Sequence, residues 1–306
     1  MSDGSSLWYV GVLLDVAATL AGAGGKQLLR YAAVTRNAWY YPLGLCLTAV
    51  IDPAFDLAAY SFAAQSIIAA CAGLTVVWNV ILAPFTLGEE LTPSRKIGAA
   101  LICLGTICLG VFGNHEEVER TPEEYLALFV RPTAIAYFAG YAIWGALCLG
   151  VYRWHSDPTV GSFFLCAFGG SLAGNSFTTK AAVELTECGV EGAVGCGDIV
   201  SPFASPLFYL FAGASLTTAT LSLALLAVSL RGYEALYMIT VYQGFFILAG
   251  ALSGNLVMDD KAGQSAERLG LYAGSVVAVL VGLYILTKGE LEAVIQAERS
   301  YERFSA

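Results

Sequence analysis

The chain has 306 residues, of which 57% are hydrophobic and only 13% charged, with a mean hydropathy of +0.68 and a net charge of −9. The charged fraction is about half that of an ordinary soluble domain, which excludes an acidic soluble protein and indicates a chain solvated by lipid. HExxH, serine-elbow and complete P-loop motifs are missing, as is any footprint of nucleic-acid binding. We therefore expect neither an enzyme nor a cofactor-binding protein.

Nine apolar stretches follow one another along the chain, each close to the roughly 20 residues that a bilayer core requires. They cover residues 7–28, 39–62, 66–87, 96–113, 132–153, 159–182, 203–230, 236–257 and 269–287. Because lipid cannot satisfy free backbone donors and acceptors, these spans must be helices. The sequence therefore predicts an all-α, polytopic membrane protein with one membrane domain over residues 1–306.

Basic residues are distributed unequally between the two sides of these spans. The side that carries the C-terminus holds ten of the 15 lysines and arginines. Positive-inside reasoning places that side in the cytoplasm and the N-terminus outside or in a lumen. The first span lacks a basic n-region, so we expect it to be retained. A plasma membrane and an endosomal membrane fit this pattern equally.

Three short motifs of the first half recur in the second half in the same order. They are LAG before Lys26 and LAG before Lys180, TVVWN at 75–79 and ITVYQ at 239–243, and EE at 89–90 and DD at 259–260. Spans 1–4 would then correspond to spans 6–9, and the odd offset of five spans would invert the second copy. The predicted parts are residues 1–113, a loop with connector span at 114–158, a second half at 159–288 and a cytoplasmic tail helix at 289–306.

Two features lie in the predicted external loops. The sequence TPEE at 121–124 is typical of a capping box and predicts a short helix. Cys188 and Cys196 flank a glycine-rich loop where oxidising conditions would allow a disulfide. Either a disulfide or two free thiols fits this spacing.

Ionisable groups within the spans are the principal candidates for chemistry, because each costs roughly 2.5–3.5 kcal/mol at a helix centre by insertion scales. Asp15, Asp52 and Asp56 are such groups. Asp52 and Asp56 are four residues apart and share a helical face, and Pro53 between them would loosen the backbone. Paired carboxylates on one face suit a cation or an exchangeable proton. Neutral or paired carboxylates that serve packing are the alternative.

Further oxygen donors are expected near the middle of the membrane. Asn79 and Gln243 occupy repeat-related positions, and span 7 adds the hydroxyl groups of Thr217, Thr218 and Thr220. Oxygen ligands favour hard cations, and Mg²⁺ usually keeps several waters while touching one or two carboxylates. Softer metals would require His or Cys beside the carboxylates, and no such cluster is evident. The predicted metal contacts are Asp52 and Asp56.

Lys26 and Lys180 allow a different interpretation. Paired lysines across an inverted repeat would suit an anionic substrate, whereas snorkelling to the nearer interface is the simpler alternative. Both readings remain open at this point.

Residues 51–63 (IDPAFDLAAYSFA), 87–92 (LGEELT) and 96–98 (KIG) resemble, in order and spacing, elements of the NIPA magnesium transporter family within the drug/metabolite transporter superfamily. The resemblance implies a nine-helix carrier of Mg²⁺ or a related divalent cation with an inward C-terminus. Asp52 stands where the family has Glu, Asp56 where it has Asn, and span 7 lacks the family's polar Gln and Asn residues.

The leading hypothesis is transport of a divalent cation, with Asp52 and Asp56 as principal contacts assisted by Asp15, Asn79 and Gln243. A proton-coupled carrier of a small organic solute, in which Lys180 meets an anion, is the second reading. A membrane receptor or scaffold without transport is the third. The expected partners are membrane lipid and the transported cation or solute, with no nucleic acid; the oligomeric state stays open.

Overall fold

The computed structural model describes most of the chain as helices. The described residues are 8–35, 39–63, 67–68, 71–87, 93–113, 120, 122–156, 158–191, 203, 205–232, 235–259 and 265–305. Within these ranges no residue belongs to a β-strand. The predicted all-α class is confirmed.

The first half of the chain contains two long helices, α1 (Trp8–Thr35) and α6 (Pro93–Phe112), with shorter helices between them. Between them lie α2 (Tyr40–Cys46), a π-helical turn η2 (Leu47–Ile51), α3 (Asp52–Tyr60) and α5 (Leu74–Leu87). A connector follows, formed by α7 (Pro122–Phe129) and α8 (Pro132–Trp154). The remainder comprises α9 (Pro158–Gly174), α10 (Phe177–Glu191), α11 (Pro206–Gly232), α12 (Ala235–Leu256) and α13 (Ala266–Ser305).

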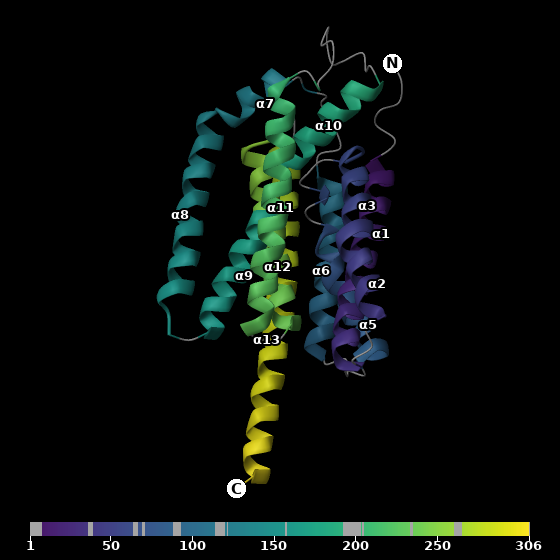
Figure 1. Cartoon of the computed structure of the whole chain (residues 1–306), viewed down its shortest axis with the longest axis vertical. Helices are drawn as coiled ribbons and strands as arrows, with labels where there is room; N and C mark the ends of the chain where they lie inside the picture. The colour runs from purple at the N-terminus through teal and green to yellow at the C-terminus, as the bar shows by residue number, and fades with distance from the viewer. Residues whose placement is uncertain are drawn as a thin grey trace.

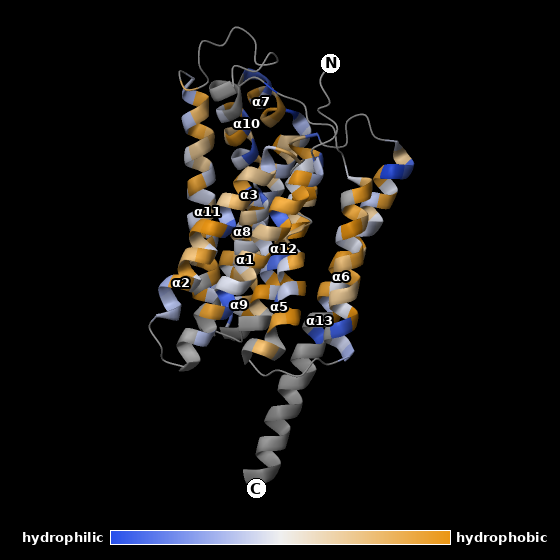
Figure 2. Ribbon diagram, turned by 90° about the vertical axis from the view of Figure 1, so that its right-hand side faces the viewer, coloured by the Kyte–Doolittle hydropathy of each residue, from blue (hydrophilic) through white to orange (hydrophobic). Residues whose placement is uncertain are grey.

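Seven segments of the described chain are long and apolar enough to cross a membrane. They are Trp8–Leu28, Tyr40–Tyr60, Pro132–Trp154, Val160–Thr186, Pro206–Leu226, Met238–Leu256 and Ala266–Ile285. The other two expected spans, 66–87 and 96–113, coincide with α5, which has 14 residues, and with α6, whose apolar part Lys96–Leu109 is shorter. The apolar colouring along the outward helices in Figure 2 agrees with a bundle solvated by lipid.

The bundle consists of two groups of helices. In the first, α1 packs against α2, η2, α3 and α5; in the second, α9 packs against α8, α11 and α12. The two groups lie side by side in Figure 1, with α8 at the outer edge of the second. An extensive α6–α13 contact joins them. Close approach there depends on small residues, because a Cβ on Gly282 would lie 2.8 Å from the Gly98 carbonyl oxygen.

Two spans depart from a regular α-helix, and the first does so next to Pro53, which was expected to loosen the backbone. Before Pro53, the backbone widens into η2, and the Asp52 N–H donates to the carbonyl of Leu47, five residues back. A proline ring clashes with the carbonyl four residues before it, and the wider turn relieves that clash. The second interruption separates α9 from α10 at Asn175 and Ser176. Both interruptions lie beside the cavity described below.

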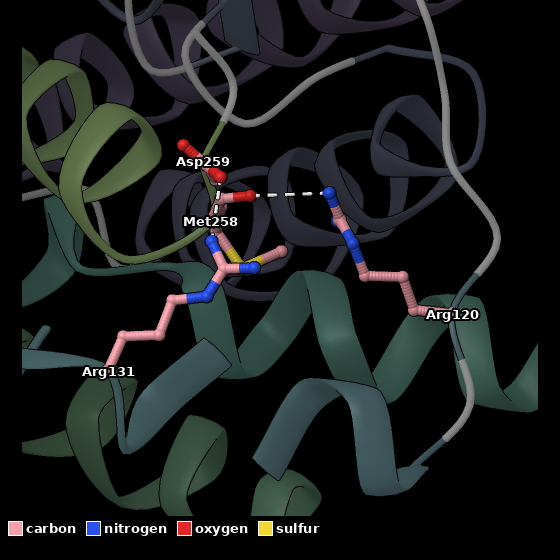
Figure 3. Close-up of polar contacts among 4 residues, drawn as sticks. All are labelled: Arg120, Arg131, Met258 and Asp259. Atoms are coloured by element: carbon pink, nitrogen blue, oxygen red, sulfur yellow. Dashed lines mark hydrogen bonds and ion pairs between the residues drawn. The ribbon is translucent and has the colours of Figure 1, made fainter. Parts of the chain in front are cut away.

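The connector helices α7 and α8 contact the end of α12 through apolar packing, an ion pair and a hydrogen bond. Tyr125 and Leu128 of α7 are buried against α10, α11 and Met258. Arg131 forms an ion pair of 2.7 Å with Asp259, and Arg120 donates to the Met258 carbonyl oxygen at 3.3 Å (Figure 3). Asp259 adopts a φ of 61°, a left-handed conformation that Asp tolerates better than most residues and that ends the helix.

Candidate functional site

A cavity of about 580 Å³ lies between the two groups of helices. Its walls come from α1, η2, α3 and α5 on one side and from α9, α10, α11 and α12 on the other. Among its described lining residues, the charged side chains are Asp15, Lys26, Asp52 and Asp56. All four belong to the first group of helices.

The three aspartates of the cavity come from two adjacent helices. Asp15, on α1, is 2% exposed, interacts directly with the side chains of Asp56 and Cys71, and has an Oδ2 atom without a hydrogen-bond partner. Asp52 and Asp56 lie one turn apart on α3. A buried carboxylate oxygen without a donor is costly unless a cation or water fills the place, which makes this wall an attractive site for a cation.

Asp52 owes its position to a glycine on the neighbouring helix. A Cβ placed on Gly22 would lie 2.1 Å from Asp52 Oδ2 and 2.6 Å from its Cγ. The carboxylate therefore occupies the space that any other residue at position 22 would fill. One turn further along α1, Gly25 provides the same kind of space for the Thr48 hydroxyl of η2. These glycines let α1 approach the carboxylate-bearing span closely.

Lys26 shares the cavity with the carboxylates, which the sequence analysis did not anticipate. It follows Gly22 by four residues and so lies on the same face of α1. It lines the cavity and interacts electrostatically with Asp52 and Asp56. The two alternatives for this lysine, an anion site and snorkelling, stay predictions, and the structure adds its position beside two carboxylates.

The two carboxamides predicted for the site have different surroundings. Gln243 lines the cavity, is 4% exposed, and has an Oε1 atom without a hydrogen-bond partner. Asn79 is buried but is not a lining residue, and its Oδ1 accepts a hydrogen bond of 3.2 Å from Gln27. Gln243 therefore meets the cavity directly, whereas Asn79 lies behind its wall.

Lys180 is not a lining residue of the cavity and instead connects the two groups of helices. Its ammonium group donates to the carbonyl oxygen of Ala63 at 3.0 Å and lies 3.1 Å from Glu184 Oε1. Ala63 follows the end of α3, where free carbonyls attract a cation. Nearby, Tyr60 donates to the Ser176 hydroxyl at 2.7 Å. An anionic substrate would have to compete with these contacts.

The opposite wall carries hydroxyl groups among apolar side chains. Thr179 and Ser215 are hydrogen-bonded at 2.6 Å, and Ser222 bonds to the Tyr242 hydroxyl at 2.7 Å. Thr218 lines the cavity, whereas Thr217 and Thr220 are exposed and donate to carbonyls of their own helix. Of the three threonines predicted in this span, only Thr218 therefore lines the cavity.

The described residues contain no group of three or more His, Cys, Asp or Glu side chains that converges as a preformed metal cage. The aspartates line one wall instead, an arrangement suited to a cation that keeps part of its hydration shell. The predicted disulfide lies outside the described part of the chain, since neither the Cys188 side chain nor Cys196 belongs to it.

The comparisons with known proteins agree with the membrane fold. Residues 11–290 match the family described as Magnesium transporter NIPA. The chain belongs to this family. The family is one of transporters, so the expectation that the chain is not an enzyme is confirmed.

Individual relatives resemble the chain at low identity. "Probable magnesium transporter NIPA6" of Arabidopsis thaliana is 24% identical over 293 residues, covering 94% of this chain and 83% of the relative. "Probable magnesium transporter NIPA1" of the same plant is 23% identical over 271 residues, covering 88% and 76%. A "Probable magnesium transporter" of Candida albicans is 26% identical over 125 residues, covering 41% and 33%. No solved structure matches the chain.

Proposed function

We propose that the chain carries Mg²⁺ or a related divalent cation through a membrane by way of the central cavity, with Asp15, Asp52 and Asp56 as the contacts of the ion. Membership of the magnesium transporter family supports the cargo. The observation that carries the residue assignment is the buried, unpartnered carboxylate oxygen of Asp15 in a cavity that also contains Asp52 and Asp56. Gln243 adds a carbonyl oxygen from the other wall.

The proposal includes a topology of nine spans in two inverted halves, with the N-terminus outside and the C-terminus in the cytoplasm. The similar placement of α1 and α9 supports it, because each helix packs against the two spans that follow it in its own half. The α6–α13 contact would then join the fourth span of one half to the fourth span of the other. Labelling of single cysteines from either side of sealed vesicles tests this topology.

Uptake into liposomes tests the function. Purified protein is reconstituted with a fluorescent Mg²⁺ indicator inside the vesicles, and the wild-type chain is compared with the variant Asp52→Asn plus Asp56→Asn. We expect the double variant to lose Mg²⁺ uptake, because neutral amides cannot replace carboxylates as charge-bearing ligands. Glu267→Gln removes an exposed carboxylate outside the cavity and is the matched control. Uptake at the wild-type level in the double variant would refute the proposal.

The cavity volume favours one second candidate, a proton-coupled carrier of a small organic solute. A volume of about 580 Å³ falls in the range of about 300–1,000 Å³ typical of small-molecule sites. The same vesicles separate the two functions: solute flux without Mg²⁺ flux would favour the second, and flux of neither would favour a receptor or scaffold.

A further inference from the structure

We propose that Lys26 is a built-in counter-cation that sets the valence of the ion the cavity accepts. The inference rests on the proposed function and adds a specificity-determining residue to it. Lys26 is the one cationic residue among the described residues that line the cavity. Its interaction partners there are the proposed ion ligands Asp52 and Asp56.

The position of Lys26 follows from the packing of α1. The carboxylate of Asp52 packs against Gly22, and Lys26 lies on the same face of α1 one turn later. A lysine near a membrane surface usually extends towards water, whereas Lys26 borders a cavity that already holds three carboxylates. The ammonium group therefore lies near particular carboxylates and not simply at the surface of the membrane.

The charges of the cavity can be summed directly. When a bound cation has replaced the proton that Asp15 and Asp56 otherwise share, Asp15, Asp52 and Asp56 contribute three negative charges and Lys26 contributes one positive charge. The remaining two negative charges are neutralised by one divalent cation. A monovalent ion would leave one buried negative charge and a trivalent ion one buried positive charge, and uncompensated charge is expensive away from water.

Lys26 would also keep the bound ion exchangeable. A transported ion must bind well enough to enter and weakly enough to leave. An ammonium group among the ligands competes with the incoming cation for Asp52 and Asp56 and repels it once it is bound. Removing that charge should tighten binding of every cation, and most strongly the binding of cations with the highest charge.

The decisive experiment compares Tb³⁺ and Mg²⁺ binding to purified full-length protein. Tb³⁺ luminescence can be sensitised by a nearby indole, and Trp78 donates a hydrogen bond of 3.2 Å to Thr19, which lines the cavity. Direct titration gives the affinity for Tb³⁺, and displacement by Mg²⁺ gives the affinity for the divalent ion. The quantity of interest is the ratio of the two affinities.

We expect Lys26→Gln to raise the ratio of Tb³⁺ to Mg²⁺ affinity by about tenfold, because the cavity then carries three net negative charges. Lys26→Arg keeps the charge and should keep the wild-type ratio. Lys96→Gln removes an exposed lysine at the start of α6, outside the cavity, and is the matched control for the loss of one positive charge. If Lys26→Gln does not yield monodisperse protein, Lys26→Met makes the same change of charge.

An unchanged ratio in the Lys26→Gln or Lys26→Met variant overturns the inference, as does an equal rise in Lys96→Gln. These failures are distinguishable from failure of the proposed function. If Asp52→Asn plus Asp56→Asn abolishes Mg²⁺ uptake while the neutral Lys26 variants keep the wild-type ratio, the ion site stands and only the role of Lys26 is wrong. If the double aspartate variant still transports Mg²⁺ normally, both proposals fall.

Discussion

The helices α1 and α9 have comparable positions in their groups, yet a glycine of α1 accommodates a side chain and glycines of α9 accommodate the main chain of another helix. On α1, Gly22 accommodates the carboxylate of Asp52. On α9, a Cβ at Gly170 would lie 2.1 Å from the Tyr242 carbonyl oxygen, and one at Gly174 would lie 2.2 Å from that of Phe246. In both groups a glycine lies where two helices cross. In the first group it makes space for a charged side chain, and in the second it makes space for the main chain of α12.

The lysines that follow these glycines differ in the same way. Lys26 borders the cavity beside Asp52 and Asp56, whereas Lys180 reaches the end of α3 and pairs with Glu184. If the two halves are related by the proposed repeat, matching positions in it need not share a function. The charged residues that line the cavity belong to the first group of helices, and the proposed cation chemistry lies there, whereas Lys180 of the second group connects the two groups.

The strongest test of this comparison is Lys180→Met. The ion pair is largely buried, with side-chain exposures of 5% for Lys180 and 14% for Glu184. Loss of one partner from a buried pair typically costs about 3–5 kcal/mol of stability. We expect a large drop in the thermal unfolding midpoint in detergent. The variant Lys180→Met plus Glu184→Leu should recover most of the loss.

Transport assays on that double variant separate a structural role from substrate binding. A connecting role predicts that cation uptake returns together with stability. If stability returns but transport does not, Lys180 contacts the cargo and the assignment of roles to the two groups is wrong.

Gly170→Ala is expected to affect stability more than transport. The added methyl group would meet the main chain of α12, which cannot rotate away, and forced overpacking typically costs about 1–3 kcal/mol. Gly213→Ala is the control, because a Cβ there has no heavy atom within 4 Å. Thermal unfolding of both variants in detergent measures the difference. Equal midpoints would show that α9 and α12 have room to separate.

Gly22→Ala should give the opposite result. The methyl group would displace the Asp52 carboxylate, so we expect Mg²⁺ uptake to fall by about tenfold, equivalent to about 1.4 kcal/mol, with little loss of stability. Gly24→Ala, on the same helix with open space around the Cβ, should transport normally. Normal uptake by Gly22→Ala would mean that Asp52 can bind the ion from another rotamer.

The smallest effect is expected at the connector. Arg131 and Asp259 are 50% and 32% exposed, and ion pairs of this kind contribute about 0–1 kcal/mol. A double-mutant cycle with Arg131→Ala and Asp259→Ala should return a coupling energy below about 1 kcal/mol. A larger value would make the connector part of the mechanism rather than a peripheral fastening.

Much of this architecture could be predicted from the sequence, because hydropathy reports directly on burial in lipid. The predicted spans at 7–28 and 132–153 match the apolar segments Trp8–Leu28 of α1 and Pro132–Trp154 of α8 closely. Asp15, Asp52, Asp56 and Gln243 were predicted as site residues and share one cavity, although their roles remain predictions. Intramembrane charge is a strong signal because it is costly, and Asp52 and Asp56 also lie one turn apart.

The remaining features depend on contacts that a linear sequence does not contain. Whether Lys26 lies near water or near carboxylates depends on which helix packs against α1, and the contact of Asp52 with Gly22 is such a long-range feature. The hydrogen bond from Gln27 that keeps Asn79 behind the wall joins residues 52 positions apart. The interruption at Asn175 carries no proline, and although Gly174, Asn175 and Ser176 are residue types that favour a helix end, the apolar stretch around them hides that signal from hydropathy.

The last helix has a practical consequence for watching this protein at work. Helix α13 continues from its apolar part Ala266–Ile285 to Ser305 without a break, and in Figure 1 its end projects well beyond the bundle. Twenty further residues form a rod of about 30 Å. A tilt of about 10° at the α6–α13 contact would swing its tip by about 5 Å. A spectroscopic probe attached near Ser305 would therefore move farther than the helices inside the membrane. Its displacement would report small changes of the angle between α6 and α13.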